Sequence, residues 1–377
     1  MNTTWRQCTI GDVCDTISNT YNSNAQQVVL INTSDVLEGK VLNHIYIPNE
    51  NLKGQFKKTF EEGDILYSEI RPQNKRYAYI DFAPINYIAS TKLMVIRNKN
   101  IVKSKYLYYF LQSDKIISEL QMLAETRSGT FPQITFNELS KLSIKIPPLP
   151  EQDRIISILD SICKKIDINQ QINDNLEEQA KALFKSWFVD FDRNEWVHCE
   201  LGDITLITAG GDRPSKYTNK KTIECHVPIY SNGIDNEGLY GYTNVAKIHE
   251  ESITISARGT IGYVCLRLEP YVPIVRLISI IPNKKELSAK YLYLWALTQN
   301  ITGTGTTQQQ LTVPIFRKTP ISIPSDTKLK QFNSIADPLF SQIESNKKEN
   351  IKLSTLRDTL LPKLMSGEIS VEDVSLD

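Results

Sequence analysis

Apolar residues recur at alternating intervals of four and three in two long stretches of the chain, one from Ile155 to Trp187 and one from Phe332 to Leu364. This spacing is typical of a helix that packs along a coiled-coil seam. No Gly or Pro occurs from residue 151 to residue 192, so the first helix is expected to run through this range, whereas Pro338 can kink the second. Each seam also contains two asparagines, which are Asn169 and Asn173 in the first and Asn346 and Asn350 in the second.

The remaining stretches contain short runs of β-branched and aromatic residues separated by Gly, Asn and Thr. Such runs predict short strands joined by turns. The clearest runs are residues 27–31, 64–68, 252–256 and 278–281. We therefore expect an α+β fold with much irregular structure in these regions.

Three short strings occur twice along the chain, in the same order. The string at 5–13 resembles that at 196–204, the string at 105–108 that at 290–293, and the string at 144–147 that at 321–324. Collinear matches of this kind indicate a duplicated unit whose loops differ in length. The sequence thus predicts two tandem globular domains, residues 1–148 and 193–325, each followed by a long helix, within residues 149–192 and 326–377.

The net charge of zero conceals an alternation of sign along the chain. The two globular regions each carry a net charge of +3, whereas the two helical regions carry −4 and −2. A modest positive charge fits contact with DNA, but on its own it does not establish that function.

The six cysteines are scattered without a Cys-x-x-Cys pair, and the four histidines are isolated. This usage favours reduced thiols in a cytoplasmic protein over a metal site. We find no signal peptide and no apolar run of the roughly 18 residues that a membrane helix needs, so no membrane contact is expected. The chain also lacks a phosphate-binding loop and the Asp/Asn-Pro-Pro-Tyr/Phe motif of methyltransferases. We expect no catalytic residue, no metal site and no cofactor in this chain.

Two strings in the helical regions are specific. Leu183–Asp192 resembles the central conserved region of the specificity subunits of type I restriction–modification systems, and Leu356–Ile369 resembles their distal conserved region. Residues 147–152, 210–215 and 256–262 are similar to further strings of the same family. The resemblance extends over essentially the whole chain.

The resemblance implies a non-catalytic subunit that gives a restriction–modification complex its DNA sequence specificity. Each globular region is then a target-recognition domain that reads one half of a bipartite site in double-stranded DNA. The implied protein partners are methyltransferase subunits and restriction–translocase subunits. These partners, and not this chain, are expected to carry S-adenosylmethionine, ATP and magnesium.

Two domains on two half-sites are expected to be related by an approximate dyad. A dyad across the helices makes them antiparallel, so the numbers of two facing seam residues always add up to the same sum. If the asparagines face each other, Asn169 with Asn350 and Asn173 with Asn346, this sum is 519. This sum pairs Trp187 with Phe332 and leaves one mismatch, Ile162 with Arg357, whose head group can leave the seam along its own stem. A parallel pairing also aligns the asparagines, and only the dyad argues against it.

Contacts to DNA need basic or amide side chains on loops. The candidates are Lys57, Lys58, Arg71, Lys75, Arg76, Arg127 and Gln133 in the first domain, and Arg213, Lys216, Lys220, Lys221, Arg258 and Gln309 in the second. Arg71 and Arg258 are the strongest candidates, because each follows a serine that ends a strand-like run by two or three residues.

Two alternative functions fit part of this pattern. The chain could be the recognition part of a type II-like restriction–modification enzyme, although the two repeats use the full chain and leave no catalytic part. It could also be a coiled-coil scaffold that binds protein instead of DNA, which would show no salt-dependent affinity for DNA.

Overall fold

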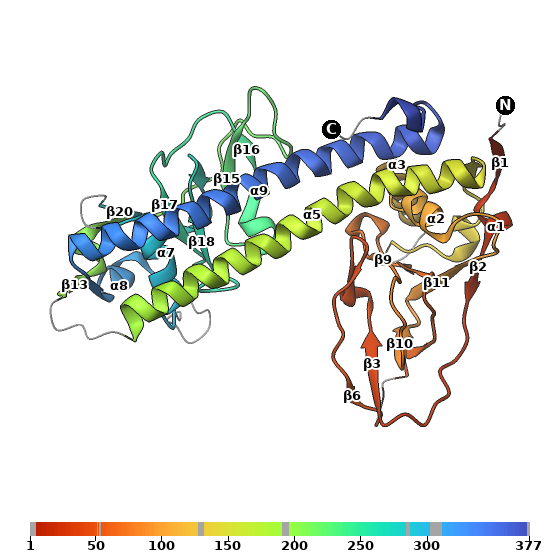
Figure 1. Cartoon of the computed structure of the whole chain (residues 1–377), viewed down its shortest axis with the longest axis horizontal. Helices are drawn as coiled ribbons and strands as arrows, with labels where there is room; N and C mark the ends of the chain where they lie inside the picture. Colours follow the sequence, from red (N-terminus) through yellow and green to blue (C-terminus); the bar gives the residue numbers. More distant parts are fainter. Residues whose placement is uncertain are drawn as a thin grey trace. The chain divides into compact units, whose positions relative to one another are not determined.

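The computed structural model describes residues 5–50, 52, 54–126, 132–190, 196–283, 287–301 and 311–374. The chain forms two compact units, one of residues 1–168 with 349–377 and one of residues 169–348. Each unit contains one globular domain and a part of both long helices (Figure 1). The first domain is therefore completed by residues that follow the whole second unit in sequence.

Within its described residues, the first unit has two four-stranded sheets and two strand pairs. One sheet has the order β2-β11-β8-β9 and the other the order β6-β3-β10-β7, while β1 pairs with β12 and β4 with β5. The strands are β1 (Arg6–Thr9), β2 (Cys14–Ile17), β3 (Gln27–Ile31), β4 (Val36–Leu37), β5 (Lys40–Val41), β6 (Ile47–Pro48), β7 (Phe56–Lys58), β8 (Ile65–Ser68), β9 (Tyr77–Tyr79), β10 (Tyr87–Ser90), β11 (Leu93–Asn98) and β12 (Ser143–Ile146).

The described strands of the second unit form a four-stranded sheet, β14-β20-β17-β18, a three-stranded sheet, β16-β15-β19, and the pair β13-β21. They are β13 (Val197–Glu200), β14 (Thr205–Ala209), β15 (Val227–Tyr230), β16 (Leu239–Thr243), β17 (Ser252–Ile255), β18 (Val264–Arg267), β19 (Val272–Pro273), β20 (Ile278–Pro282) and β21 (Pro320–Ile323). β3, β8, β17 and β20 match the four predicted runs to within one residue.

The two units repeat one strand arrangement, as the duplicated sequence predicts. The order β2-β11-β8-β9 corresponds to β14-β20-β17-β18. A parallel pair also recurs, β3 with β10 in the first unit and β15 with β19 in the second. The α+β class predicted from the sequence is confirmed.

Short helices pack beside these sheets. They are α1 (Ile10–Val13), α2 (Ser104–Leu111), α3 (Asp114–Glu125) and α4 (Phe136–Leu139) in the first unit, and α6 (Leu201–Ile204), α7 (Ala289–Leu297) and α8 (Val313–Arg317) in the second. The repeated Lys-Tyr-Leu-Tyr string begins α2 and α7, where Lys105 forms an ion pair with Asp160 and Lys290 one with Asp337. In each unit this ion pair links the domain to a long helix, through Asp160 in the first unit and Asp337 in the second.

The long helices are α5 (Leu149–Phe184) and α9 (Asp326–Ser366). The α-helix of α5 ends before residue 192, contrary to the prediction from the absence of Gly and Pro, and a π-helical turn follows at Lys185–Val189. This turn places Phe188 in the core of the second unit, where its ring lies 5.0 Å from that of Phe332. The helix α9 continues through Pro338.

In each unit the two helices run antiparallel. In the second unit, the side chain of Asn346 donates to that of Asn173 at 2.8 Å, and the rings of Trp187 and Phe332 lie 6.4 Å apart. Both pairs have the predicted sum of 519. In the first unit, Arg154 pairs with Glu372 and Lys165 with Glu349, so the partner's number again falls as that in α5 rises. The predicted antiparallel pairing is confirmed.

The asparagines of the first pair occur in different units, with Asn169 in the second and Asn350 in the first. In the first unit, the side-chain amide of Asn350 donates to the carbonyl oxygen of Ile166 at 3.3 Å. Farther along the seam of this unit, Ile155 and Leu159 share one core with Leu360 and Leu364.

Candidate nucleic-acid interface

The loop that follows β8 in the first unit carries Arg71. Ser68 ends the strand, and its hydroxyl accepts a hydrogen bond from the backbone N–H of Ile70 at 3.0 Å. Arg71 then adopts a left-handed backbone with φ of 44° and precedes a 3-10 helix at Pro72–Asn74. The exposed side chain of Arg71 is therefore placed by a tight turn at the end of a fully buried strand.

A second segment of the chain joins this turn. The backbone N–H of Arg71 donates to the carbonyl of Pro132 at 3.0 Å, and Ile70 forms a β-bridge with Gln133. Two of the predicted residues, Arg71 and Gln133, are thus brought together from distant parts of the sequence. The predicted residue Arg127 lies outside the described residues.

The turn between β10 and β11 supplies a basic residue that the sequence analysis missed. Lys92 is exposed in this turn, and its ammonium lies 3.2 Å from the side-chain oxygen of Gln133 and 3.5 Å from a carboxylate oxygen of Glu69. In the sequence, this position could have been found as a lysine, Lys92, between two mainly apolar runs at 87–90 and 93–98. Arg71, Lys92 and Gln133 together form what we call the first basic cluster.

Lys58 has an internal role beside this cluster. Its ammonium donates to the carbonyl oxygens of Thr91 at 3.0 Å and Leu93 at 2.8 Å. Burial lowers the pKa of Lys58. The side chain therefore supports the turn that carries Lys92, whereas the neighbouring Lys57 is exposed.

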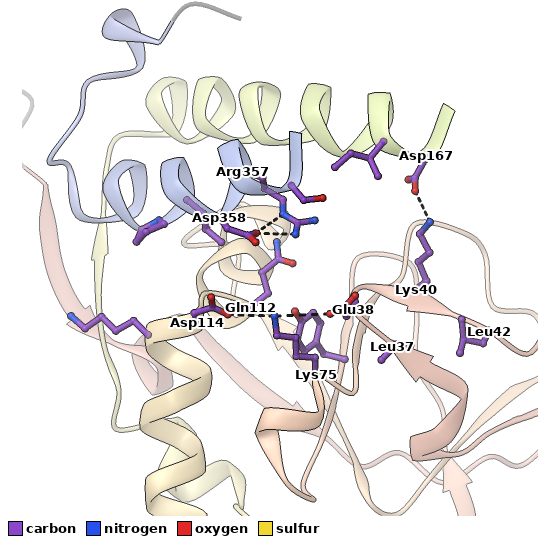
Figure 2. Close-up of a pocket in the computed structure, with 16 residues that line it drawn as sticks. Leu37, Glu38, Lys40, Leu42, Lys75, Gln112, Asp114, Asp167, Arg357 and Asp358 are labelled. Atoms are coloured by element: carbon purple, nitrogen blue, oxygen red, sulfur yellow. Dashed lines mark hydrogen bonds and ion pairs between the residues drawn. The ribbon is translucent and has the colours of Figure 1, made fainter. Parts of the chain in front are cut away.

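Lys75 and Arg76 also bond to other residues of the first unit. The ammonium of Lys75 pairs with Asp114 at 3.4 Å and with Glu38 at 4.0 Å, as Figure 2 shows. The guanidinium of Arg76 donates to the backbone carbonyl of Ser34 at 3.2 Å. Both basic side chains are therefore engaged in contacts within the first unit.

Lys75 lines a cavity of about 380 Å³ in the first unit, together with Arg357 of α9. Figure 2 shows that basic and acidic side chains alternate around this cavity. Arg357, the mismatched seam residue, pairs there with Asp358 at 2.9 Å. The long stem of Arg357 lets its charged head group reach Asp358 beside this cavity.

Two loops of the second unit contact the side chain of Asn232. Its oxygen accepts from the backbone N–H of Ala257 at 2.8 Å, and its amide donates to the carbonyl of Val275 at 2.6 Å. Ala257 precedes the predicted residue Arg258, and Val275 precedes Arg276, which the sequence analysis missed. Both arginines are exposed, and Arg276 has φ of 60°.

A third loop begins at Gly210. The N–H groups of Val275 and Arg276 donate to the carbonyls of Gly211 and Gly210, each at 2.8 Å. A Cβ atom at Gly210 would lie 2.7 Å from the backbone nitrogen of Ile274, so this close approach requires glycine. The glycine pair thereby brings the segment that carries Arg213 against the turn that carries Arg276.

Arg213 belongs to a basic segment on this third loop. Its guanidinium stacks over the ring of Tyr217 at 4.0 Å and donates to the hydroxyl of Tyr240 at 3.0 Å. Lys216 forms an ion pair with Glu224. Lys220 and Lys221 are exposed on the same segment. We call Arg213, Arg258 and Arg276 the second basic cluster; the predicted Gln309 lies outside the described residues.

The two clusters occupy corresponding places in the two units. Arg71 follows β8 and Arg258 follows the corresponding strand β17, while Lys92 and Arg276 lie in the corresponding turns that lead into β11 and β20. In each unit, the segment before the next short helix, α4 or α8, also bonds to the loop that carries the arginine. Ile134 donates to the carbonyl of Glu69 at 2.8 Å, and Leu311 donates to that of Ala257 at 3.2 Å.

The described residues hold neither a candidate metal site nor a candidate membrane span. No group of three or more His, Cys, Asp and Glu side chains in these residues is placed to hold a metal ion. None of the helices in the described ranges combines the length and apolar character needed to span a membrane.

Comparison with known proteins identifies the family. Residues 2–178 and 193–355 each match the family model described as the type I restriction modification DNA specificity domain. The specificity subunit of the type I restriction enzyme HindI from Haemophilus influenzae is 33% identical, and the match covers 97% of this chain and 99% of that protein. The MjaIX specificity subunit of Methanocaldococcus jannaschii is 28% identical over 78% of this chain and 77% of that protein.

A solved structure has the same fold. The type I restriction–modification S subunit from M. genitalium superimposes with a TM-score of 0.53 and 18% identity, covering 97% of this chain and 96% of that one. Two family domains in tandem, a relative of matching length and the shared fold agree with one another. The chain belongs to the family of DNA specificity subunits of type I restriction–modification systems.

Proposed function

We propose that this chain reads a bipartite sequence in double-stranded DNA, with the first basic cluster on one half and the second on the other. The observation that carries the proposal is the recurrence of two basic positions, Arg71 with Lys92 and Arg258 with Arg276, at corresponding places in two units. A protein that reads two half-sites with a duplicated domain needs this correspondence.

The arrangement of each cluster suits two kinds of contact. Arginine and amide side chains can form paired hydrogen bonds with base edges, whereas lysine acts on phosphates as a point charge. Arg71 and Arg258, on tight turns that fix their backbones, are proposed to read bases. Lys57, Lys92, Lys220 and Lys221 are proposed to contact phosphates, which position the protein without reading sequence.

We further propose that methyltransferase subunits dock on the helices α5 and α9, and that restriction–translocase subunits join them. The family of the chain and the acidic charge of the helical regions support this assignment. In this proposal, S-adenosylmethionine, ATP and magnesium belong to the partner subunits. The chain itself contributes sequence recognition.

The test uses the chain in complex with its methyltransferase subunit. Its cognate duplex is first defined by the adenines that the complex methylates, and Kd is then measured for this duplex and for duplexes with one half scrambled. Arg258→Ala should reduce discrimination at one half by about 1–3 kcal/mol, and Arg71→Ala should do so at the other half alone. Lys330→Ala, which removes an exposed lysine of α9, is the matched control.

The expected result is specific to each half-site, because each arginine belongs to one unit. If neither Arg71→Ala nor Arg258→Ala changed Kd at several salt concentrations while both proteins stayed folded, the assignment of the basic clusters would be wrong.

A further inference from the structure

Asn232 is the structural link between two loops of the second basic cluster. It contacts one loop through its oxygen and the other through its N–H, at Ala257 and Val275. Each contact lies one residue before an arginine, Arg258 or Arg276. Only a side chain that both donates and accepts can make these two bonds, which an amide of this length does.

The backbone that carries Asn232 is itself held in a tight loop. Asn232 follows β15 by two residues, and the N–H of Ser231 donates to the carbonyl of Gly238 at 2.8 Å. Gly238 has φ of 79°, and a Cβ atom there would lie 2.5 Å from the carbonyl oxygen of Ser231. The position of Asn232 is therefore coupled to the residue that precedes Gly238.

That residue, Glu237, is held from two sides. Arg267 of β18 is only 4% exposed, stacks over Tyr230 at 3.5 Å and donates to the backbone carbonyl of Glu237 at 2.6 Å. From α9, the ammonium of Lys347 lies 2.7 Å from one carboxylate oxygen of Glu237, and Arg267 lies 3.3 Å from the other. Glu237 keeps a left-handed backbone, with φ of 55°, under these contacts.

We propose that Asn232 is a positioning residue for sequence recognition, and that the ion pair between Glu237 and Lys347 sets its place from helix α9. Asn232 fixes the spacing of Arg258 and Arg276, which touch DNA, without touching it. This inference rests on the proposed function, because it assumes that these two arginines read the second half-site.

The physical consequence concerns discrimination more than affinity. A hydrogen-bonded contact to a base edge is lost when a side chain moves by a fraction of an ångström, because paired bonds need fixed geometry. A phosphate contact tolerates such movement, since it depends mainly on charge. Loosening the Asn232 link should therefore reduce sequence discrimination while leaving non-specific binding nearly unchanged.

The experiment again uses the complex with the methyltransferase subunit and measures Kd for the cognate duplex and for duplexes with either half altered. Asn232→Ala and Lys347→Gln should each reduce discrimination at the half read by the second unit by roughly tenfold. Discrimination at the other half and Kd for unrelated DNA should change less than about twofold. Asn232→Asp keeps the shape and the acceptor but cannot donate to Val275, so it should behave like Asn232→Ala even if the alanine variant folds poorly.

Two controls separate positioning from a general effect on the fold. Lys348→Gln breaks the adjacent ion pair of α9 with Glu269, at 2.8 Å, and should leave discrimination unchanged. Lys347→Arg keeps the charge and should restore it.

The proposal is overturned if Asn232→Asp or Lys347→Gln keeps full discrimination, if Lys348→Gln loses as much as Lys347→Gln, or if both halves lose equally. Failure of the proposed function looks different, because Arg258→Ala and Arg276→Ala would then also leave discrimination unchanged.

Discussion

The two units hold equivalent loops in different ways. Each has a Glu-Gly pair with positive φ ahead of a strand, Glu38-Gly39 in the first unit and Glu237-Gly238 in the second. In the first unit, Lys40 beside this pair bonds to Asp167 of α5; in the second, Glu237 bonds to Lys347 of α9. The polarity of the ion pair between loop and helix is thus reversed.

This reversal indicates which features of the repeat are constrained. The strand order and the left-handed turn recur in both units, whereas the charges that fasten the turn differ. The two units therefore share strand order and turn conformation, but each holds its turn with different ion pairs. A loop moved from one unit into the other would meet a helix residue of unsuitable charge.

The anchors also differ in their surroundings. The side chains of Lys40 and Asp167 are 63% and 44% exposed, so solvent screens their attraction. The side chains of Glu237 and Lys347 are 40% and 41% exposed, but Arg267, which also bonds to Glu237, is only 4% exposed. An arginine–carboxylate pair of the first unit lies elsewhere, between the half-buried Arg97 of β11 and the buried Asp64, which precedes β8.

The largest expected effect comes from removing the buried support of the second unit. Arg267→Ala removes the donor to the backbone carbonyl of Glu237 and one of the two cations beside its carboxylate, and it empties the space over Tyr230. It should lower the unfolding free energy of this unit by about 3 kcal/mol. Chemical denaturation followed by tryptophan fluorescence measures this loss, since three of the four tryptophans, Trp187, Trp196 and Trp295, belong to the second unit. A loss below about 1 kcal/mol would show that this arginine resembles the exposed anchor of the first unit.

Asp64→Asn should have an intermediate effect on the first unit. The carboxylate receives two hydrogen bonds from Arg97, at 2.8 and 2.7 Å, and the amide can keep only one of them. We expect a loss of about 2 kcal/mol, because hydrogen bonds to charged groups contribute about 1.5–3 kcal/mol. Unfolding can be followed by alkylation of the buried Cys14; an unchanged midpoint would place the stability of this unit elsewhere.

Lys40→Ala should have a small effect. An exposed ion pair contributes about 0–1 kcal/mol, so the alkylation midpoint of the first unit should shift by no more than that. The shift should also disappear at high salt, because screening already removes the attraction. If Lys40→Ala cost as much as Arg267→Ala, the difference between the two anchors would vanish.

The smallest effect at neutral pH concerns Cys14 itself. Burial, helped by the charge of Asp15, raises the pKa of this thiol to about 12 from its ordinary value of 9.0. Below pH 9 the thiol is protonated in both states and does not affect stability. Between pH 9 and pH 12 only the unfolded chain loses the proton, so the stability of the first unit should fall as pH rises. In Cys14→Ala, this part of the pH dependence should be absent.

The sequence predicted the helices better than it predicted the clusters. Seam spacing and the position of the asparagines are local properties, and together with the expected dyad they placed Asn173 opposite Asn346. Arg276 and Lys92 could not be assigned in this way, because their importance arises from turns that join strands paired across the chain. Lys58 looked like a DNA contact for the same reason, since its internal carbonyl partners exist only once β7 lies beside β10.

The end of α5 shows a further limit of sequence pattern. The absence of Gly and Pro predicts a helix up to residue 192, but the aromatic side chain of Phe188 is buried in the second unit, and the backbone accommodates it with a π-helical turn. Burial of one large ring changed the helix where propensity alone gave no reason for it. The exposed and basic positions of Arg71 and Arg258 were predicted correctly, although their contact with DNA stays a prediction.

The division of both long helices between the units has a consequence for the order of folding during synthesis. Domains generally fold as their residues become available, with the N-terminal one first. Here the first unit needs residues 349–377, whose Leu360 and Leu364 complete its core, whereas the second unit is complete at residue 348. During synthesis, the first unit therefore cannot complete its core until the whole second unit has been translated.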